Sequence, residues 1–263
     1  MKPAKLTGVI HLPALPGSPK NALLMSEILE RTVLDAQALA DAGFDLAMIE
    51  NFGDAPFFAG SVPAVTIAAM TACAFAIREA LPNLPLGVNV LRNDVASAIA
   101  IAHVVDARAV RVNVLSGARV TDQGIIEGRA ADTLRLRKDL GADGVEIWAD
   151  VDVKHSAPLA PRPVAEEAAE LHERALADAL LVTGKGTGAP IAASDLAKAR
   201  EGAPAARIYV ASGSRIEDLK SIAERANGVV VGSALRTSGR AGDPIDLDIA
   251  KKFADAFRSA FEL

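Results

Sequence analysis

The sequence of 263 residues is poor in aromatic side chains and almost lacks cysteine. Aromatic residues make up 4% of the chain, whereas hydrophobic residues make up 51%. A large core must therefore be built from Ala, Val, Leu and Ile, which suits parallel strands that are buried on both faces. The single cysteine, Cys73, excludes an internal disulfide bond and fits the reducing conditions of the cytoplasm.

An excess of basic residues is also absent. The net charge is -5 at pH 7 and the sequence pI is about 5.5, which argues against nucleic acid or an anionic membrane surface as a partner. The apolar run near the N-terminus ends at His11, so we expect no secretory signal. The apolar run 62–77 is shorter than the roughly 18–20 residues that cross a bilayer, so we expect no membrane insertion.

Short β-rich runs alternate with longer helical patterns along the whole chain. The expected strands are 6–12, 45–51, 84–91, 109–115, 145–151, 179–184, 207–213 and 228–233. The expected helices are 26–42, 61–80, 94–106, 129–141, 163–177, 194–200, 216–226 and 244–261. Eight β-α units in order predict one α/β domain over residues 1–263, a (β/α)8 or TIM barrel. A doubly wound open sheet is the alternative, but such sheets commonly have about five to seven strands.

Alternation within the expected strands brings polar side chains to one end of this barrel. Residues two apart share a face of a strand, and the functional groups of this fold lie where the strands end. The opposite faces of the same strands are almost wholly apolar. We therefore predict a site at the carboxyl ends of the strands, formed by His11, Glu50, Asn89, Arg111, Asn113, Asp150, Asp152, Lys154 and Thr183.

The fifth expected strand carries the densest set of ionisable residues. Alternation places Asp150, Asp152 and Lys154 on one side, with His155 in the loop beyond. Carboxylates beside a lysine keep each other charged, while burial favours the neutral forms, so either group would serve as an acid or a base near neutral pH. Lys154 would form a Schiff base if desolvation lowered its pKa. A structural ion pair at the rim is the alternative.

Glu50 and Asp54, after the second expected strand, form another carboxylate pair with His11 nearby. We count His11 and Glu50 among the catalytic candidates. A divalent metal bound by Glu50, Asp150 or Asp152 is kept open as a cofactor. No spacing in the sequence is diagnostic of a metal, so we assign no metal ligand.

The connection 116–128 after the fourth expected strand is long and contains three glycines. It predicts a lid over the barrel mouth, with an ordinary surface loop as the alternative. Its Asp122 joins the other residues expected to contact a substrate, which are Asn51, Asn89, Arg111, Asn113 and Thr183.

A phosphate site is expected at the ends of the last strands. Glycines there let backbone N–H groups approach an anion, and a helix that starts at Ile216 adds a favourable dipole. The loop 183–188 would complete the site, although it is not a Walker A motif. Each glycine has the alternative role of a simple turn residue. The candidate phosphate-binding residues are Gly184, Lys185, Ser212, Gly213, Ser214, Gly232 and Ser233.

Eight motifs between residues 6 and 247 resemble the BtpA/SgcQ family. In chain order they are GVIHLPALPGSP, IENFGDAPF, GVNVLRND, RVNVLSGARVTDQGIIEG, ADVDVKHSAPL, VTGKGTG, ASGS and VVVGSALR. The resemblance implies a (β/α)8 barrel of the phosphate-binding type. It also implies two kinds of role, because cyanobacterial members are linked to photosystem I biogenesis and other members to carbohydrate or nucleoside catabolism.

The function we favour is an enzyme that acts on a phosphorylated small molecule, a sugar phosphate or a nucleoside-derived sugar, by lyase or isomerase chemistry. One alternative is a non-catalytic assembly factor for a membrane complex. Another is cleavage of a glycosidic bond in a nucleoside, for which Glu50 and Asp150 would supply the carboxylate pair. We expect a homo-oligomer because barrels of this kind often associate.

Overall fold

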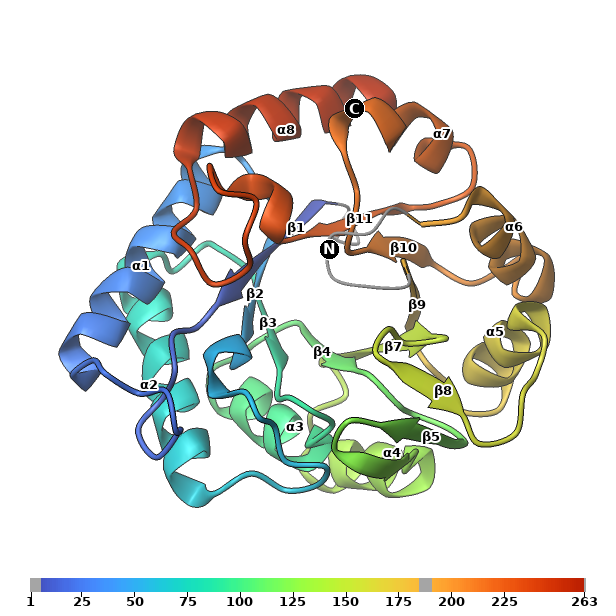
Figure 1. Ribbon diagram of the computed structural model, residues 1–263, viewed down its shortest axis with the longest axis horizontal. Helices are drawn as coiled ribbons and strands as arrows, with labels where there is room; N and C mark the ends of the chain where they lie inside the picture. The colour runs from blue at the N-terminus through green and yellow to red at the C-terminus, as the bar shows by residue number, and fades with distance from the viewer. Residues whose placement is uncertain (1–5, 185–190, 263) are drawn as a thin grey trace.

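The computed structural model describes residues 6–184 and 191–262, and these form a closed barrel of eight parallel strands (Figure 1). The first strand pairs with both the second and the last, which closes the ring. The predicted (β/α)8 barrel is thereby confirmed. In chain order its strands are β1 (Leu6–His11), β2 (Leu46–Glu50), β3 (Leu86–Asn89), β4 (Ala109–Val112), β7 (Glu146–Val151), β9 (Ala179–Thr183), β10 (Ile208–Ala211) and β11 (Gly228–Val231).

Within the described residues, eight α-helices surround the barrel (Figure 1) and lie close to the expected ranges. They are α1 (Met25–Asp41), α2 (Ala64–Ala80), α3 (Val95–Val104), α4 (Ala130–Asp139), α5 (Val164–Glu173), α6 (Ala193–Gly202), α7 (Leu219–Ala223) and α8 (Leu247–Ala260). The clearest difference concerns the expected helix 216–226. It begins as a 3-10 turn, η2 (Ile216–Asp218), and continues as the short α7. In the described ranges, no helix combines the length and apolar character needed to traverse a bilayer.

The core has two layers that follow the alternation along each strand. Ile10, Ile49 and Ile147 pack outward against the helices. Inside the barrel, Trp148 and Tyr209 are fully buried with ring centroids 5.0 Å apart. Aliphatic side chains such as Leu46, Met48 and Leu181 pack around these two rings inside the barrel.

A small antiparallel sheet stands at the rim on the α4 and α5 side of the ring (Figure 1). It consists of β5 (Ala118–Thr121), β6 (Gly124–Glu127) and β8 (Ser156–Pro158), in the order β6-β5-β8. The segment that we expected to be a lid is therefore an ordered hairpin. Its pairing with β8 ties it to the chain that leaves β7.

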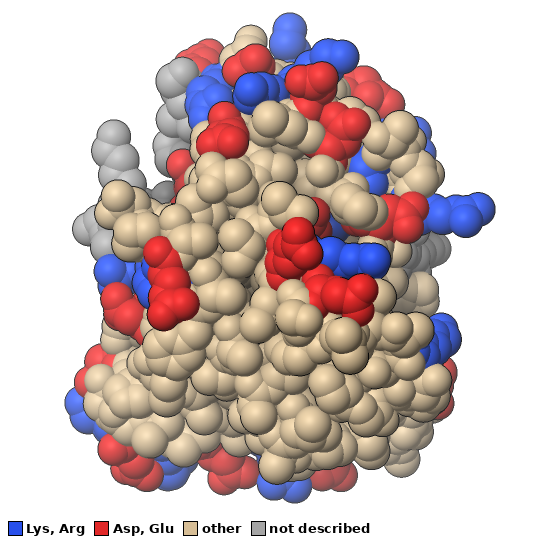
Figure 2. Space-filling view, turned by 90° about the vertical axis from the view of Figure 1, so that its left-hand side faces the viewer, with Lys and Arg blue, Asp and Glu red and all other residues tan. Residues whose placement is uncertain are grey.

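The face of the molecule with α1 and α2 carries charges of both signs at its top and bottom and in groups near its middle, with uncharged surface between these groups (Figure 2). No basic patch covers this face, in keeping with the net charge of -5. The homo-oligomer expected from the sequence stays a prediction.

The close approach of α5 and α6 generates a stability prediction. A Cβ atom added at Gly202 would lie 1.9 Å from the backbone oxygen of Ala165, so Gly202→Ala must push the two helices apart. We expect a loss of about 1–3 kcal/mol in the free energy of unfolding, measured by urea denaturation. Gly144→Ala is the matched control, because nothing lies within 4 Å of its added Cβ. Equal stabilities of the two variants would contradict this packing.

Candidate functional site

Seven polar side chains meet where the barrel strands end. They come from β1, β2, β3, β4, β7 and the residues that directly follow these strands. We call this set the mouth cluster: His11, Glu50, Asn89, Arg111, Asn113, Asp150 and Lys154.

Asp150 and Arg111 form the centre of the mouth cluster. Arg111 donates from Nε to Oδ2 at 3.1 Å and from Nη2 to Oδ1 at 3.0 Å. Asn113 donates to the same Oδ2 at 2.5 Å. The Asp150 side chain is 0% exposed. Burial lowers the pKa of Arg111, but the charges of Asp150 and Glu50 outweigh it and raise the pKa overall. Arg111 is therefore fully charged in the interior, and both of its hydrogen bonds in this bidentate pair go to one carboxylate.

Glu50 lies between a cation and a histidine. Its Oε2 accepts a hydrogen bond from Asn89 Nδ2 at 2.7 Å and lies 3.9 Å from Arg111 Nη1. Its Oε1 lies 4.0 Å from His11 Nε2. In contrast to Asp150, Glu50 has one oxygen that is not held by a short hydrogen bond in the described residues. It is thus the carboxylate of the cluster that is best placed to exchange a proton with a ligand.

His11 is buried at the end of β1. Burial, and then the charges of Arg236, Lys154 and Arg111, lower its pKa well below 6.5, so the imidazole is neutral at pH 7. Its ring packs against Phe52, with centroids 4.7 Å apart. Its Nδ1 is buried and has no hydrogen-bond partner among the described residues. A neutral imidazole with an unused nitrogen is suited to hydrogen bonding with a ligand.

Lys154 extends its amine toward the loop after β10. Its Nζ donates a hydrogen bond to Ser212 Oγ at 3.1 Å. Burial lowers the pKa of Lys154 to about 8, and the charges of Arg111 and Arg92 add to this effect, against Glu50 and Asp150. About a tenth of this amine is therefore unprotonated at pH 7, far more than for an ordinary lysine.

Two buried arginines next to the cluster were missed by the alternation argument, because both lie in loops rather than in strands. Arg92, after β3, donates from Nη2 to the backbone oxygen of Lys154 at 2.6 Å. Arg236, after β11, donates to the backbone oxygens of Val9, Gly232 and Asp243. The only signal that included them was their place in the motifs GVNVLRND and VVVGSALR.

Asp152 departs from the predicted alternation. The strand ends at Val151, and Asp152 adopts a φ of 48°, which turns the chain. Its side chain is 55% exposed and pairs with Arg119 of the hairpin, while its N–H donates to Glu167 Oε1 of α5 at 3.1 Å. The structure therefore places Asp152 toward the hairpin and α5, outside the mouth cluster.

Three further candidates lie around the cluster rather than within it. His155 is exposed, and burial, Lys154 and Arg92 lower its pKa. Asp122 is exposed at the hairpin turn, where its charge acts on Arg92 and His155. Asn51 joins two loops, because its Oδ1 accepts from the N–H of Leu91 at 2.7 Å and its Nδ2 donates to Asp54 at 3.1 Å.

The expected phosphate residues surround the ends of β9, β10 and β11. Ser212 and Gly213 have φ values of 75° and 73°, a left-handed pair at the end of β10. Next to them, Ser214 Oγ and Thr183 Oγ1 are buried and have no partner in the described ranges. Backbone and hydroxyl groups arranged in this way suit an anion.

Other features of the predicted phosphate site differ from the expectation. The expected helix dipole at Ile216 is weak, because a 3-10 turn and the five-residue α7 replace a long helix. Gly232 lies against His11, whose Cε1 would be 2.8 Å from an added Cβ, and Ser233 begins a 3-10 turn, η3 (Ser233–Leu235). Gly184 is buried after β9, and Lys185 lies outside the described residues.

The carboxylates that we considered for a divalent metal have separate partners. Glu50 is bound by Asn89, Asp150 by Arg111 and Asp152 by Arg119. Within residues 6–184 and 191–262, no three His, Cys, Asp or Glu side chains are grouped in a way that could hold a metal ion.

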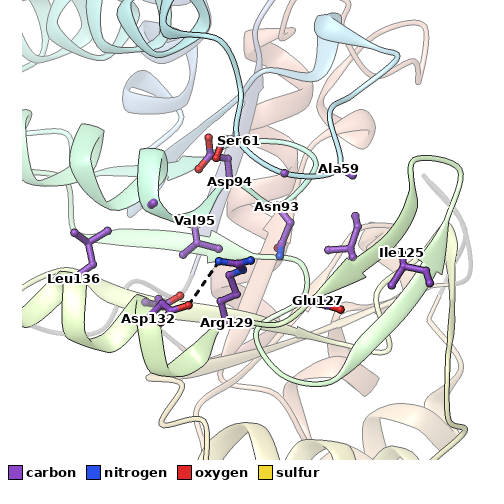
Figure 3. A pocket seen from close by; sticks show the side chains of 14 residues that line it. Ala59, Ser61, Asn93, Asp94, Val95, Ile125, Glu127, Arg129, Asp132 and Leu136 are labelled. Carbon is purple, nitrogen blue, oxygen red and sulfur yellow. Dashed lines mark ion pairs between the residues drawn. The ribbon is translucent and has the colours of Figure 1, made fainter.

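A pocket of about 460 Å³ lies outside the barrel between the hairpin, α3 and α4 (Figure 3). Its walls include Asn93, Ile125 and Leu136, and it shares no residue with the mouth cluster. The ion pair drawn in Figure 3, Arg129 to Asp132 at 3.8 Å, joins two side chains that are more than 70% exposed. The mouth, by contrast, holds buried ionisable groups whose pKa values are shifted, so we place the functional site there and not in this pocket.

The buried Arg111–Asp150 pair generates a second stability prediction. Asp150→Ala removes the only carboxylate that Arg111 binds by hydrogen bonds among the described residues, so we expect a loss of about 3–5 kcal/mol in the free energy of unfolding by urea denaturation. Asp143→Ala removes an exposed partner of Lys138 and is expected to cost less than about 1 kcal/mol. Similar losses for both variants would show that the buried pair has no special role.

The comparisons with solved structures concern the fold. Orotidine 5'-phosphate decarboxylase from Pyrococcus horikoshii aligns with a TM-score of 0.59 at 14% identity, and the alignment covers 96% of this chain and 99% of that one. At this identity the likeness supports the barrel architecture alone.

The sequence comparisons are closer and cover the whole barrel. Uncharacterized protein MJ1115 of Methanocaldococcus jannaschii is 40% identical over 97% of this chain and 95% of its own length. Photosystem I biogenesis protein BtpA of a Synechocystis strain is 40% identical over 95% of this chain and 86% of its own length. The model of the BtpA family matches residues 2–259. The chain therefore belongs to the BtpA family.

Proposed function

We propose that this protein is an enzyme that acts on a phosphorylated small molecule, with a sugar phosphate favoured, by acid–base chemistry of the lyase or isomerase type. The observation that carries the proposal is the charge of the mouth. In the described residues, Arg92, Arg111 and Lys154 face the two carboxylates of Glu50 and Asp150, whereas Arg236 at the edge has the charges of Asp35 and Asp243 near it. Buried positive charge in excess needs an anion, and a phosphate ester supplies one.

Phosphate binding and proton transfer would take place on different sides of the mouth. The phosphate would lie at Ser212, Gly213 and the unpartnered hydroxyls of Ser214 and Thr183. Proton transfer would use Glu50, with neutral His11 as its neighbour at 4.0 Å. Lys154 extends from the side of the mouth with Glu50 to Ser212 on the side expected to bind phosphate. The reacting carbon would therefore lie between Glu50 and the phosphate.

The alternative roles receive less support from the geometry. A glycosidase needs two carboxylates that are both ready to react, but both oxygens of Asp150 are held by Arg111, with Asn113 on one of them. The relative from Synechocystis is named for photosystem I biogenesis, which would suit a non-catalytic assembly factor. A surface for assembly does not require a buried cluster of charges, whose desolvation is costly.

Stabilisation by ligands tests the phosphate part of the proposal. A phosphorylated sugar at about 100 times its Kd should raise the free energy of unfolding by roughly 2.7 kcal/mol, whereas its dephosphorylated counterpart should have little effect. The measurement is a thermal-shift series with sugar phosphates such as ribose 5-phosphate, each compared with the free sugar.

Gly213→Val should weaken this response at least tenfold in ligand concentration, because a β-branched side chain is strained at the φ of 73° and would displace the loop. Gly141→Val is the matched control. It has a φ of 65°, but it follows α4 at the opposite end of the barrel. If no phosphorylated compound shifts the melting temperature, the proposal is wrong.

A further inference from the structure

We propose that Lys154 is a covalent nucleophile whose amine forms an imine with the carbonyl carbon of a phosphorylated aldehyde or ketone. The inference rests on the proposed function and narrows its substrate class to phosphate esters that carry a carbonyl group. The arguments are the position of the amine, its lack of an ion-pair partner, its fixed backbone and the proton-transfer group beside it.

The position of the amine comes first. Lys154 Nζ lies 3.1 Å from Ser212 Oγ, at the start of the left-handed pair formed by Ser212 and Gly213. A phosphate held by this loop would bring the adjoining carbons of the substrate next to Nζ. Among the other lysines of the described ranges, Lys20 is exposed in the loop between β1 and α1, and the rest, such as Lys138 and Lys252, are on the outer helices.

The amine is not used as a structural counter-ion. In the part of the chain that the structure describes, no carboxylate oxygen lies within 4.0 Å of Lys154 Nζ. Asp150 and Glu50 are close enough for their charges to act on Lys154, but Asp150 is paired with Arg111 and Glu50 with Asn89. A largely buried lysine without an ion-pair partner is unfavourable unless it is needed for chemistry.

The backbone that carries Lys154 is held on both sides. Arg92 donates to the backbone oxygen of Lys154 at 2.6 Å. The preceding turn at Asp152 is fixed by Arg119 and Glu167, and His155 on the other side has a φ of 56°. Because its neighbours set the backbone, the side chain enters the mouth in a defined direction.

The ionisation of the amine agrees with this role. An imine forms only from the unprotonated amine, which for an ordinary lysine with a pKa of about 10.4 is scarce at neutral pH. Burial, together with Arg111 and Arg92, lowers the pKa of Lys154 to about 8. The unprotonated fraction near pH 7.5 is therefore on the order of a hundredfold higher than for an exposed lysine.

The reaction needs no reagent beyond substrate and water. The nitrogen lone pair attacks the carbonyl carbon, a C–N bond forms, and the carbonyl oxygen accepts a proton. A proton then passes from nitrogen to the resulting hydroxyl, the C–O bond breaks, and water leaves with the oxygen. The product is a protonated imine. Overall, one proton is consumed and one water molecule is released. Glu50, when protonated, can supply that proton.

The imine then acts as an electron sink. The carbon next to the imine carbon can then lose a proton or its bond to the following carbon. The electron pair of the broken bond moves into the C–N system and gives a neutral enamine. Glu50 accepts the proton released from that carbon or from a β-hydroxyl group. Reprotonation of carbon and attack of water on the imine return free Lys154 and the product. This sequence covers both the isomerase and the lyase chemistry of the proposed function.

Reductive trapping tests the inference. The protein is incubated separately with dihydroxyacetone phosphate, glyceraldehyde 3-phosphate and ribose 5-phosphate, treated with sodium borohydride, and examined by intact mass and by peptide mapping. We expect one borohydride-dependent addition per chain with at least one compound, located on Lys154 in the wild-type protein. Labelling should rise with pH through about 8, whereas exposed lysines need pH values near 10.

Variants and a binding measurement separate the possible failures. Lys154→Met should abolish the addition, while Lys138→Met, at an exposed lysine paired with Asp143, should retain it. The inference is overturned if the addition is absent, lies only on exterior lysines, or persists in Lys154→Met. If the same compounds still raise the melting temperature, the phosphate-binding proposal survives that result. If they neither label nor stabilise the protein, both proposals fail.

Discussion

The buried pair between Arg111 and Asp150 is the interaction on which the rest of the mouth depends. Two charges without solvent are tolerable in a protein interior only when hydrogen bonds satisfy them, and here Arg111 meets both oxygens of Asp150 while Asn113 supplies a third bond. The guanidinium also reaches to within 3.9 Å of Glu50. One side chain thus orients one carboxylate, attracts a second and lowers the pKa of Lys154.

Strand alternation was enough to predict from the sequence that the side chains of the mouth cluster lie together. In a parallel barrel the direction of a side chain depends on its parity within the strand, which is a local property, and the core inside the barrel follows the same rule at Val9, Met48 and Trp148. His11, Glu50, Asn89 and Asp150 therefore face the mouth as expected, since each lies at the last or next-to-last position of its strand.

Prediction failed where the chain leaves a strand and long-range contacts decide its course. Asp152 takes a left-handed backbone conformation and turns to Arg119, a residue 33 positions away in the sequence. No local pattern contains that contact. The hairpin 118–127 was not predicted as a hairpin for a related reason, because its edge pairs with the distant residues Ser156–Pro158, and its role as a lid stays a prediction. Arg92 lies in a loop and could be identified only after the loops were placed.

The electrostatics of the mouth link phosphate binding to the reactivity of Lys154. A bound phosphate dianion raises the pKa of a neighbouring amine, which by itself disfavours the reactive neutral form. The protonated imine, however, carries a positive charge until the neighbouring bond breaks, and the same phosphate stabilises this cation as it forms. Arg111 and Arg92 act in the opposite direction, since they keep the pKa of Lys154 near 8 before a ligand arrives. Arg111 and Arg92 thus favour the unprotonated Lys154 amine that must attack, and the phosphate of the substrate stabilises the protonated imine that forms. The excess positive charge of the mouth therefore contributes to both steps, because it also attracts that phosphate.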